Sequence, residues 1–157
     1  MSPTAPGDLR VLTELGPAEQ EAAFALRHRV FVDEQAVPVD LERDGLDGEA
    51  KHAVVLAPDG TALATGRILV LGEVAKYQRI AVARDLRGHG LGRLVMDALD
   101  GLARASGCRT ARLSSQVDAI GFYERLGFEA RGETYLEAGI LHRDMLRDFH
   151  QPGGNRR

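Results

Sequence analysis

One segment in the second half of the chain has the clearest helical periodicity. Its apolar residues recur at spacings of three and four and so form one stripe: Leu91, Leu94, Val95, Ala98, Leu99 and Leu102. Gly107 closes this helical region. A second helix is predicted from Gly16-Pro17 to about Phe31, because proline is favoured in a first helical turn. A short third helix is predicted over residues 117–126, with Gly127 as its stop.

Short apolar or alternating segments predict the strands. They cover residues 8–14, 53–56, 61–71, 77–82, 110–114, 128–136 and 140–147. Pro58-Asp59-Gly60 and Ala138-Gly139 supply the turns of two hairpins. Residues 33–50 are acidic and interrupted by proline and glycine, so a loop with one helical turn is expected there. The resulting order, β-α-loop-β-β-β-α-β-α-β-β, predicts a mixed α/β domain with an antiparallel run in its middle.

The composition is that of one globular domain. The chain has 157 residues, of which 44% are apolar and 27% charged. We expect a single domain over residues 1–157, with its core at about 8–147 and loose termini at 1–7 and 151–157. The formal net charge of −3 argues against a general nucleic-acid binder. The lone Cys108 permits no internal disulfide, and no signal peptide or membrane-length apolar run stands out, so a cytoplasmic location is expected.

A glycine-rich turn precedes the periodic helix: Arg87-Gly88-His89-Gly90-Leu91-Gly92. Such a turn can bind phosphate, because the first N–H groups of a helix lack internal partners and its dipole favours negative charge. A nucleoside-triphosphate P-loop is excluded, since Arg93-Leu94 stands where lysine and serine or threonine are needed. The dinucleotide fingerprint also fails, since Arg93 or Val95 stands at its third glycine. Three glycines in five residues favour a phosphate site over a plain tight turn.

With these motifs the sequence resembles the GNAT superfamily of N-acetyltransferases. Ile80-Ala81-Val82 and the glycine turn match the first motif of that family, and residues 119–128 are similar to its second, a helix carrying Phe122-Tyr123. The resemblance covers about residues 8–147 and implies a GNAT-like acyl-CoA N-acyltransferase fold, a single layer of about six to seven strands flanked by helices. Residues 27–35, together with the acidic stretch and His52, resemble more closely the ElaA-like branch.

The resemblance implies acetyl-CoA as cosubstrate and direct transfer of its acetyl group to a primary amine in a ternary complex. The glycine turn would bind the pyrophosphate, and the preceding strand the acetyl and pantetheine parts. Gln116 stands where many members have asparagine and keeps an amide that could contact CoA. The implied cosubstrate-binding residues are Ile80, Ala81, Val82, Arg87, Gly88, His89, Gly90, Leu91, Gly92, Arg93, Gln116, Phe122 and Tyr123. The alternative is a non-catalytic CoA-binding sensor or interaction module on the same fold.

Three residues are candidates for the proton transfers. Tyr123 is the candidate acid for the departing thiolate, because a phenol with a pKa near ~10 is protonated at neutral pH and the resemblance implies a tyrosine beside the sulfur. Glu34 is the first candidate for the base that accepts the amine proton, and His142 is the second. The competing interpretations are core packing for Tyr123, a solvated helix-end charge for Glu34 and a structural histidine for His142.

The acidic stretch at residues 40–49 raises the question of a metal. A calcium loop of the EF-hand type needs glutamate at its twelfth position, and Lys51 stands there when the count begins at Asp40, so no metal is expected. An acidic rim that attracts a cationic amine and a merely solvated loop are the two remaining interpretations. The expected partners are acetyl-CoA and an amine, without nucleic acid or membrane. The protein is expected to be a monomer or a homodimer, since an edge hairpin could pair with a second copy.

Overall fold

The computed structural model describes residues 8–149. Its seven strands follow one another across the sheet in the order β1-β2-β3-β4-β5-β7-β6, and all three predicted helices are present, the first with a different end. The described residues form two compact units. The first unit runs to Ile68 and also includes Arg79–Leu102, and the second consists of Leu69–Gln78 and the residues from Ala103 on. The termini predicted to be loose, 1–7 and 151–157, lie outside the described residues.

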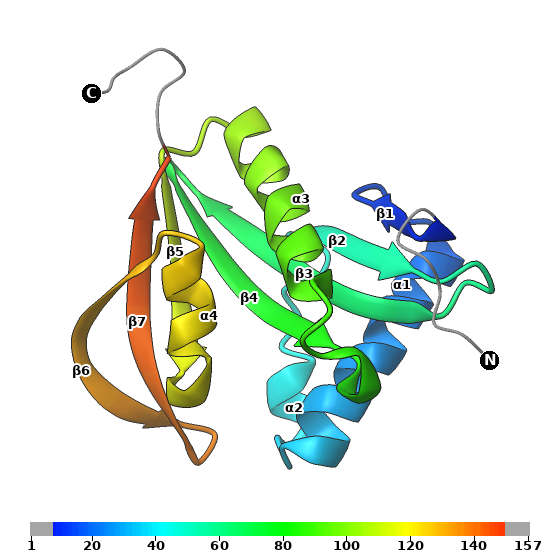
Figure 1. The fold of residues 1–157 in the computed structure, drawn as a ribbon, viewed down its shortest axis with the longest axis horizontal. Helices are drawn as coiled ribbons and strands as arrows, with labels where there is room; N and C mark the ends of the chain where they lie inside the picture. The colour runs from blue at the N-terminus through cyan, green and yellow to red at the C-terminus, as the bar shows by residue number, and fades with distance from the viewer. Residues whose placement is uncertain (1–7, 150–157) are drawn as a thin grey trace. The chain divides into compact units, whose positions relative to one another are not determined.

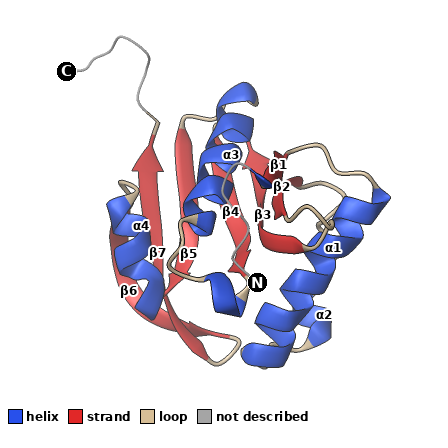
Figure 2. Ribbon diagram, turned by 45° about the vertical axis from the view of Figure 1, so that its right-hand side comes forward, coloured by secondary structure: helices blue, strands red, loops and turns tan. Residues whose placement is uncertain are grey.

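The first unit contains the amino-terminal elements (Figure 2). They are β1 (Arg10–Leu12), α1 (Pro17–Arg27), α2 (Val39–Glu42), β2 (Lys51–Leu56), most of β3 (Ala62–Leu71), the end of β4 (Val74–Val82) and most of α3 (Leu91–Ala105). The first three strands are antiparallel. In the turn between β2 and β3 the Asp59 carboxylate accepts the Thr61 N–H at 2.9 Å and Gly60 has a φ of 88°, which confirms the predicted hairpin.

The segment after α1 differs in part from the prediction, because the α-helix ends earlier than expected. The predicted helix to about Phe31 continues instead as a π-helical segment, His28–Glu34, and only then gives way to a loop. Four residues, Val39–Glu42, form the single helical turn expected within that loop. Apolar periodicity does not distinguish π-helical from α-helical turns, because both keep a buried stripe over such a short length.

Helices α1 and α3 cover opposite faces of the strands in the first unit. Ala81 belongs to an apolar cluster with residues of α1 and β2, among them Leu26 and Val54. The neighbouring Ile80 points the other way, toward Gly66. A Cβ at Gly66 would lie 2.6 Å from Ile80 Cδ1 and 2.9 Å from Val95 Cγ1 of α3, so glycine is what lets strand and helix approach here.

The second unit is built on the carboxyl-terminal strands (Figure 1). It holds β5 (Thr110–Gln116), the 3-10 turn Val117–Ala119, α4 (Ile120–Arg125), β6 (Glu129–Glu137) and β7 (Ile140–Asp148). The first part of β4 pairs with β5 in parallel, from Val74 opposite Thr110 to Tyr77 opposite Leu113. The hairpin of β6 and β7 turns at Ala138 and Gly139, both with positive φ, as the Ala-Gly pair predicted.

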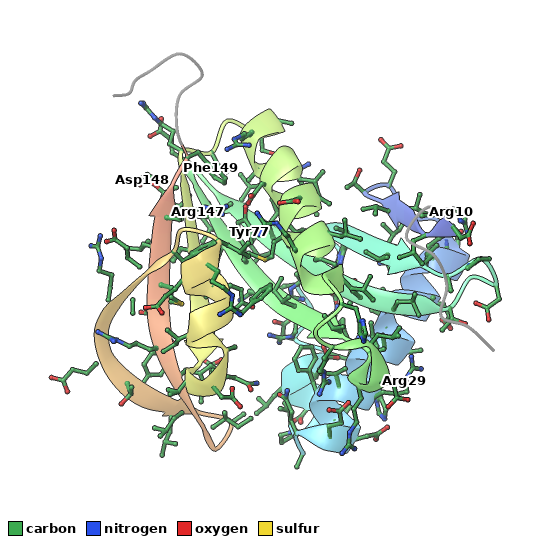
Figure 3. The ribbon with its side chains drawn as sticks, viewed as in Figure 1. Arg10, Arg29, Tyr77, Arg147, Asp148 and Phe149 are labelled. Atoms are coloured by element: carbon green, nitrogen blue, oxygen red, sulfur yellow. The ribbon has the colours of Figure 1, made fainter. Side chains whose placement is uncertain are left out.

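Aromatic rings and one arginine form the packing of this unit. Tyr77 and Tyr123 each meet Phe128 edge to face, at centroid distances of 6.1 and 5.9 Å. The Arg147 guanidinium lies 4.4 Å from the Phe128 ring and 5.3 Å from the Phe149 ring, close to the end of β7 (Figure 3). Within residues 8–149 none of the helices has the length and apolar character needed to cross a membrane.

Candidate functional site

The glycine turn begins α3 with a left-handed backbone. Gly88 and Gly90 both have a φ of 85°, a region that favours glycine, and nothing lies within 4 Å of the position that a Cβ would take at either. The Leu94 N–H bonds to the Gly90 carbonyl at 3.2 Å. The N–H groups of residues 91–93 therefore precede the helical ladder and are available to an anion.

Arg87 ties this turn to its surroundings in the first unit. Its Nε donates to the Val82 carbonyl at 3.2 Å, and its Nη2 lies 2.9 Å from the Glu34 carboxylate. Glu34 is the last residue of the π-helical segment. The first candidate base is thus ion-paired with the first residue of the predicted phosphate turn, and protonation of Glu34 would weaken that pair.

The strand before the turn is irregular at Arg79, whose φ is 59° although it is not a glycine. The parallel ladder with β5 ends at Tyr77, two residues earlier. Ile80, Ala81 and Val82, the residues predicted to bind the acetyl and pantetheine parts, follow directly after this irregularity. Their backbone direction therefore depends on the conformation of Arg79.

The acidic stretch is not merely a solvated loop, because three of its carboxylates, those of Glu42, Asp44 and Asp47, are bound to buried arginines. Arg27, only 2% exposed, lies 2.6 Å from Glu42 and 2.7 Å from Asp47. Arg67, fully buried in the middle of β3, lies 2.6 Å from Asp44 and 2.8 Å from Asp47. These carboxylates neutralise arginines that would otherwise be buried without a counter-charge.

One sequence signal for this network was overlooked. Arg67 stands in the middle of an otherwise apolar strand, and a charged side chain in such a strand needs a partner of opposite charge. The acidic stretch between α1 and β2, with five carboxylates within residues 40–49, is the densest source of such partners. Among the described residues, no three His, Cys, Asp or Glu side chains are grouped as ligands for a metal ion.

The network changes the protonation of Asp47. Burial alone would raise the pKa of this carboxyl group, but hydrogen bonds and charge from Arg27 and Arg67 outweigh burial and lower the pKa to about 2. The pKa of Asp44 is lowered as well, because its bonds to Arg67 and to the Leu46 N–H outweigh the effect of burial. Both groups therefore remain ionised in the folded protein well into the acidic range.

In the second unit, Tyr123 projects from α4 into the aromatic group. It is 9% exposed and meets Phe122 at a centroid distance of 4.9 Å as well as Phe128. Burial raises the pKa of its phenol above the ordinary value of 10, so the group is protonated at any physiological pH. Within residues 8–149 its hydroxyl has no hydrogen-bond partner, which is unusual for a buried phenol.

His142 lies on β7, opposite Gln116 of β5, so two predicted site residues are neighbours in the second unit. The imidazole is 8% exposed, and its Nδ1 lies 2.7 Å from the Ile140 carbonyl. Because a carbonyl only accepts, Nδ1 carries the proton, and in the neutral ring Nε2 holds the lone pair. No other residue of the described chain bonds to Nε2.

A hydrogen-bonded group beside His142 was not predicted. The Tyr135 ring stacks on the imidazole at a centroid distance of 6.1 Å, and the Tyr135 hydroxyl donates to Asp144 at 2.6 Å and also bonds to the Ser114 hydroxyl. Tyr135 lies on β6, Asp144 on β7 and Ser114 on β5. Their meeting depends on strand register, for which the sequence offers no local signal.

Comparison with known proteins places the chain in a family. Residues 14–149 match the acetyltransferase (GNAT) domain. The chain belongs to the GNAT family. YjcF of Bacillus subtilis, named as an N-acetyltransferase, is 37% identical over 128 residues, which are 80% of this chain and 90% of YjcF. The family resemblance read from the glycine turn and the Phe-Tyr helix is therefore confirmed.

Solved structures agree with this assignment. An acyl-CoA N-acyltransferase from Pseudomonas aeruginosa superposes with a TM-score of 0.76 at 34% identity, over 89% of this chain and 98% of that one. Escherichia coli ElaA superposes with a TM-score of 0.75 at 29% identity, over 88% and 98%. The fold is thus the acyl-CoA N-acyltransferase fold predicted from the sequence, a mixed α/β arrangement with seven strands flanked by helices.

The buried carboxylates predict how stability depends on pH. A carboxyl group with a lower pKa in the folded chain binds protons more tightly in the unfolded chain, so acid favours unfolding. The free energy of unfolding should fall as the pH drops from the ordinary Asp value of 3.8 through about 2, the folded pKa of Asp47. It can be measured by urea unfolding at a series of pH values.

Asp47→Asn should start from a lower stability at neutral pH and lose less over the acidic interval. Asp33→Asn, at a position 61% exposed, is the matched control and should follow the wild-type curve. An identical loss of stability in wild type and Asp47→Asn would contradict the assignment.

Proposed function

We propose that this protein transfers the acetyl group of acetyl-CoA to a primary amine by direct attack within a ternary complex. The observation that carries the proposal is the Tyr123 hydroxyl, which is buried, neutral and unpaired within the described residues. A buried hydroxyl without a hydrogen-bond partner lowers the stability of the fold. Its presence here therefore suggests that a ligand atom accepts a hydrogen bond from it. The sulfur of CoA is such an atom in the chemistry of this family.

The glycine turn supplies the anchor for the pyrophosphate. Its two left-handed glycines leave open space beside the backbone, and the free N–H groups at the start of α3 supply donors. Arg87 adds a guanidinium that is 45% exposed and already oriented by Val82 and Glu34. Together they suit a ligand with clustered negative charge.

The reaction needs a polarised carbonyl, a neutral amine and a protonated leaving group. The amine nitrogen forms a bond to the thioester carbon, and the C–S bond breaks as the tetrahedral intermediate collapses. Backbone N–H groups of Ile80–Val82 would stabilise the carbonyl oxygen during this step. Tyr123 would give its proton to the departing sulfur, so that CoA leaves as the thiol.

Two observations favour His142 over Glu34 as the group that accepts the amine proton. The carboxylate of Glu34 is ion-paired with Arg87, so protonation would disrupt a contact of the phosphate turn. His142 keeps Nε2 as an acceptor, because Nδ1 is fixed as the donor to Ile140. A non-catalytic CoA-binding module would need neither a neutral buried phenol nor an oriented imidazole, so the enzyme is the better interpretation.

The donor is tested by ligand-induced stabilisation. Acetyl-CoA and CoA should each raise the melting temperature of the full chain, because a ligand present at 100 times its Kd stabilises a protein by about 2.7 kcal/mol. ATP and NAD, which carry phosphates without pantetheine, should stabilise it less at equal concentration. Absence of stabilisation by both CoA species would refute the proposed donor.

The acid is tested by Tyr123→Phe, which removes one hydroxyl and keeps the ring packing on Phe128. Turnover of acetyl-CoA with a screened amine should fall by about 10²-fold or more, the usual contribution of a positioned acid. CoA affinity, measured by calorimetry, should stay near the wild-type value. Tyr77→Phe removes the hydroxyl of the second tyrosine whose ring packs on Phe128, and this control should keep turnover. Unchanged turnover in Tyr123→Phe would remove this residue from the mechanism.

The two bases are separated by the pH dependence of the same assay. His142→Gln should remove the limb of the kcat profile that reports the base and lower kcat, while the KM for acetyl-CoA changes little. Glu34→Gln should act mainly on the KM for acetyl-CoA, because it releases Arg87. The reverse pattern, with the limb that reports the base lost in Glu34→Gln and kept in His142→Gln, would assign proton abstraction to Glu34.

A further inference from the structure

Arg79 has a backbone conformation that a non-glycine residue rarely keeps without support. Its φ of 59° lies in the left-handed region, where the Cβ is crowded by the backbone. It also stands in β4, where an extended conformation would otherwise continue to Val82. Something in the surrounding structure must therefore hold this residue in place.

The side chain of Arg79 supplies that support through the segment around α2. Its guanidinium donates to the Leu41 carbonyl at 3.0 Å, to the Glu42 carbonyl at 3.2 Å and to the Asp44 carboxylate at 3.2 Å. It also lies 3.4 Å from the Glu42 carboxylate. Several donors of one planar guanidinium are thus engaged by a single short segment.

That segment is itself anchored to the unit. Arg27 of α1 binds the Glu42 carboxylate and carbonyl, at 2.6 and 3.2 Å. Arg67 of β3 binds Asp44 at 2.6 Å from a fully buried position. The segment that binds Arg79 is therefore itself held by buried ion pairs to α1 and to β3.

The packing on both faces of β4 depends on this conformation. Ile80 fits against Gly66 on the α3 face, and Ala81 fits the cluster beside α1. Relaxing Arg79 to an extended residue would turn the following backbone over and exchange the two side chains between faces. The N–H groups of the strand would turn with them.

We infer that Arg79 is a positioning residue for acetyl transfer: held by the segment around α2, it sets the direction of the Ile80–Val82 N–H groups that face the acetyl carbonyl. The inference rests on the proposed function, since it assigns a task to the same strand. Arg79 itself touches neither substrate, and its effect passes through the backbone. Such preorganised donors matter because small misplacements of a catalytic dipole are costly to the rate.

The experiment compares amide spectra of the full chain at saturating acetyl-CoA and at saturating CoA. The two ligands differ only in the acetyl group, so the difference in 1H–15N shifts at residues 80–82 reports the carbonyl contact. Shifts at Gly90–Arg93 report the pyrophosphate contact and serve as an internal reference. Arg79→Ala should lose the acetyl-specific difference at residues 80–82 and keep the reference shifts.

Two further variants complete the design. Arg79→Lys keeps a positive charge, which protects folding, but lacks the planar fork, so it should lose part of the acetyl-specific difference. Arg43→Ala is the matched control, because Arg43 lies 3.8 Å from Asp47 in the same network and makes no bond to Arg79. It should behave as wild type.

The outcomes separate the inference from the proposed function. Wild-type acetyl-specific shifts in both Arg79 variants would overturn the positioning role while leaving acetyl-CoA binding intact. Absence of reference shifts in the wild type with either ligand would refute the proposed function, and the inference would fall with it. Loss of the difference in Arg79→Ala, with Arg43→Ala unchanged, is the result expected of a positioning residue.

Discussion

Burial of arginine is the constraint on which the first unit is built. Arg27 and Arg67 are almost completely removed from solvent, and no apolar packing can compensate for a guanidinium without a counter-charge. The carboxylates of Glu42, Asp44 and Asp47 provide that counter-charge, and all three come from one segment between α1 and β2. The path of this segment is therefore dictated by electrostatics, whereas hydrophobic burial dictates the positions of α1 and α3.

The second unit buries polar side chains instead of charged ones, among them the Tyr123 phenol and the His142 imidazole. Its aromatic packing removes the Tyr123 phenol from water and so keeps it neutral. The strand register on the other side of β5 sets His142 beside Gln116 and fixes its tautomer through Ile140. A neutral donor and a neutral acceptor suit the proposed acyl transfer, because charge develops on the reacting atoms only as the bonds change.

The features that the sequence predicted well are those that a short segment determines alone. The stripe from Leu91 to Leu102 specifies α3 by its own spacing, and glycines with positive φ specify the turn before it. Features that depend on distant partners were missed or misjudged. The acidic residues were expected to be solvent-exposed because their arginine partners are distant in the sequence. Glu42 lies 15 positions from Arg27, and Asp44 lies 23 positions from Arg67. The contact of Ser114 with Tyr135 follows from two ladders that no local pattern encodes.

The candidate site shows the same division. The glycine turn and the Phe122-Tyr123 pair are contiguous motifs, and the sequence of these motifs alone indicates the family that the GNAT domain match shows. The irregular φ of Arg79 lies within a sequence that reads as an ordinary strand, so only the backbone reveals it. For protein engineering, this means that the segment around α2 is not an independent module. The segment around α2 shares its charges with α1, β3 and β4, so it cannot be grafted between relatives unless the matching arginines are transplanted with it.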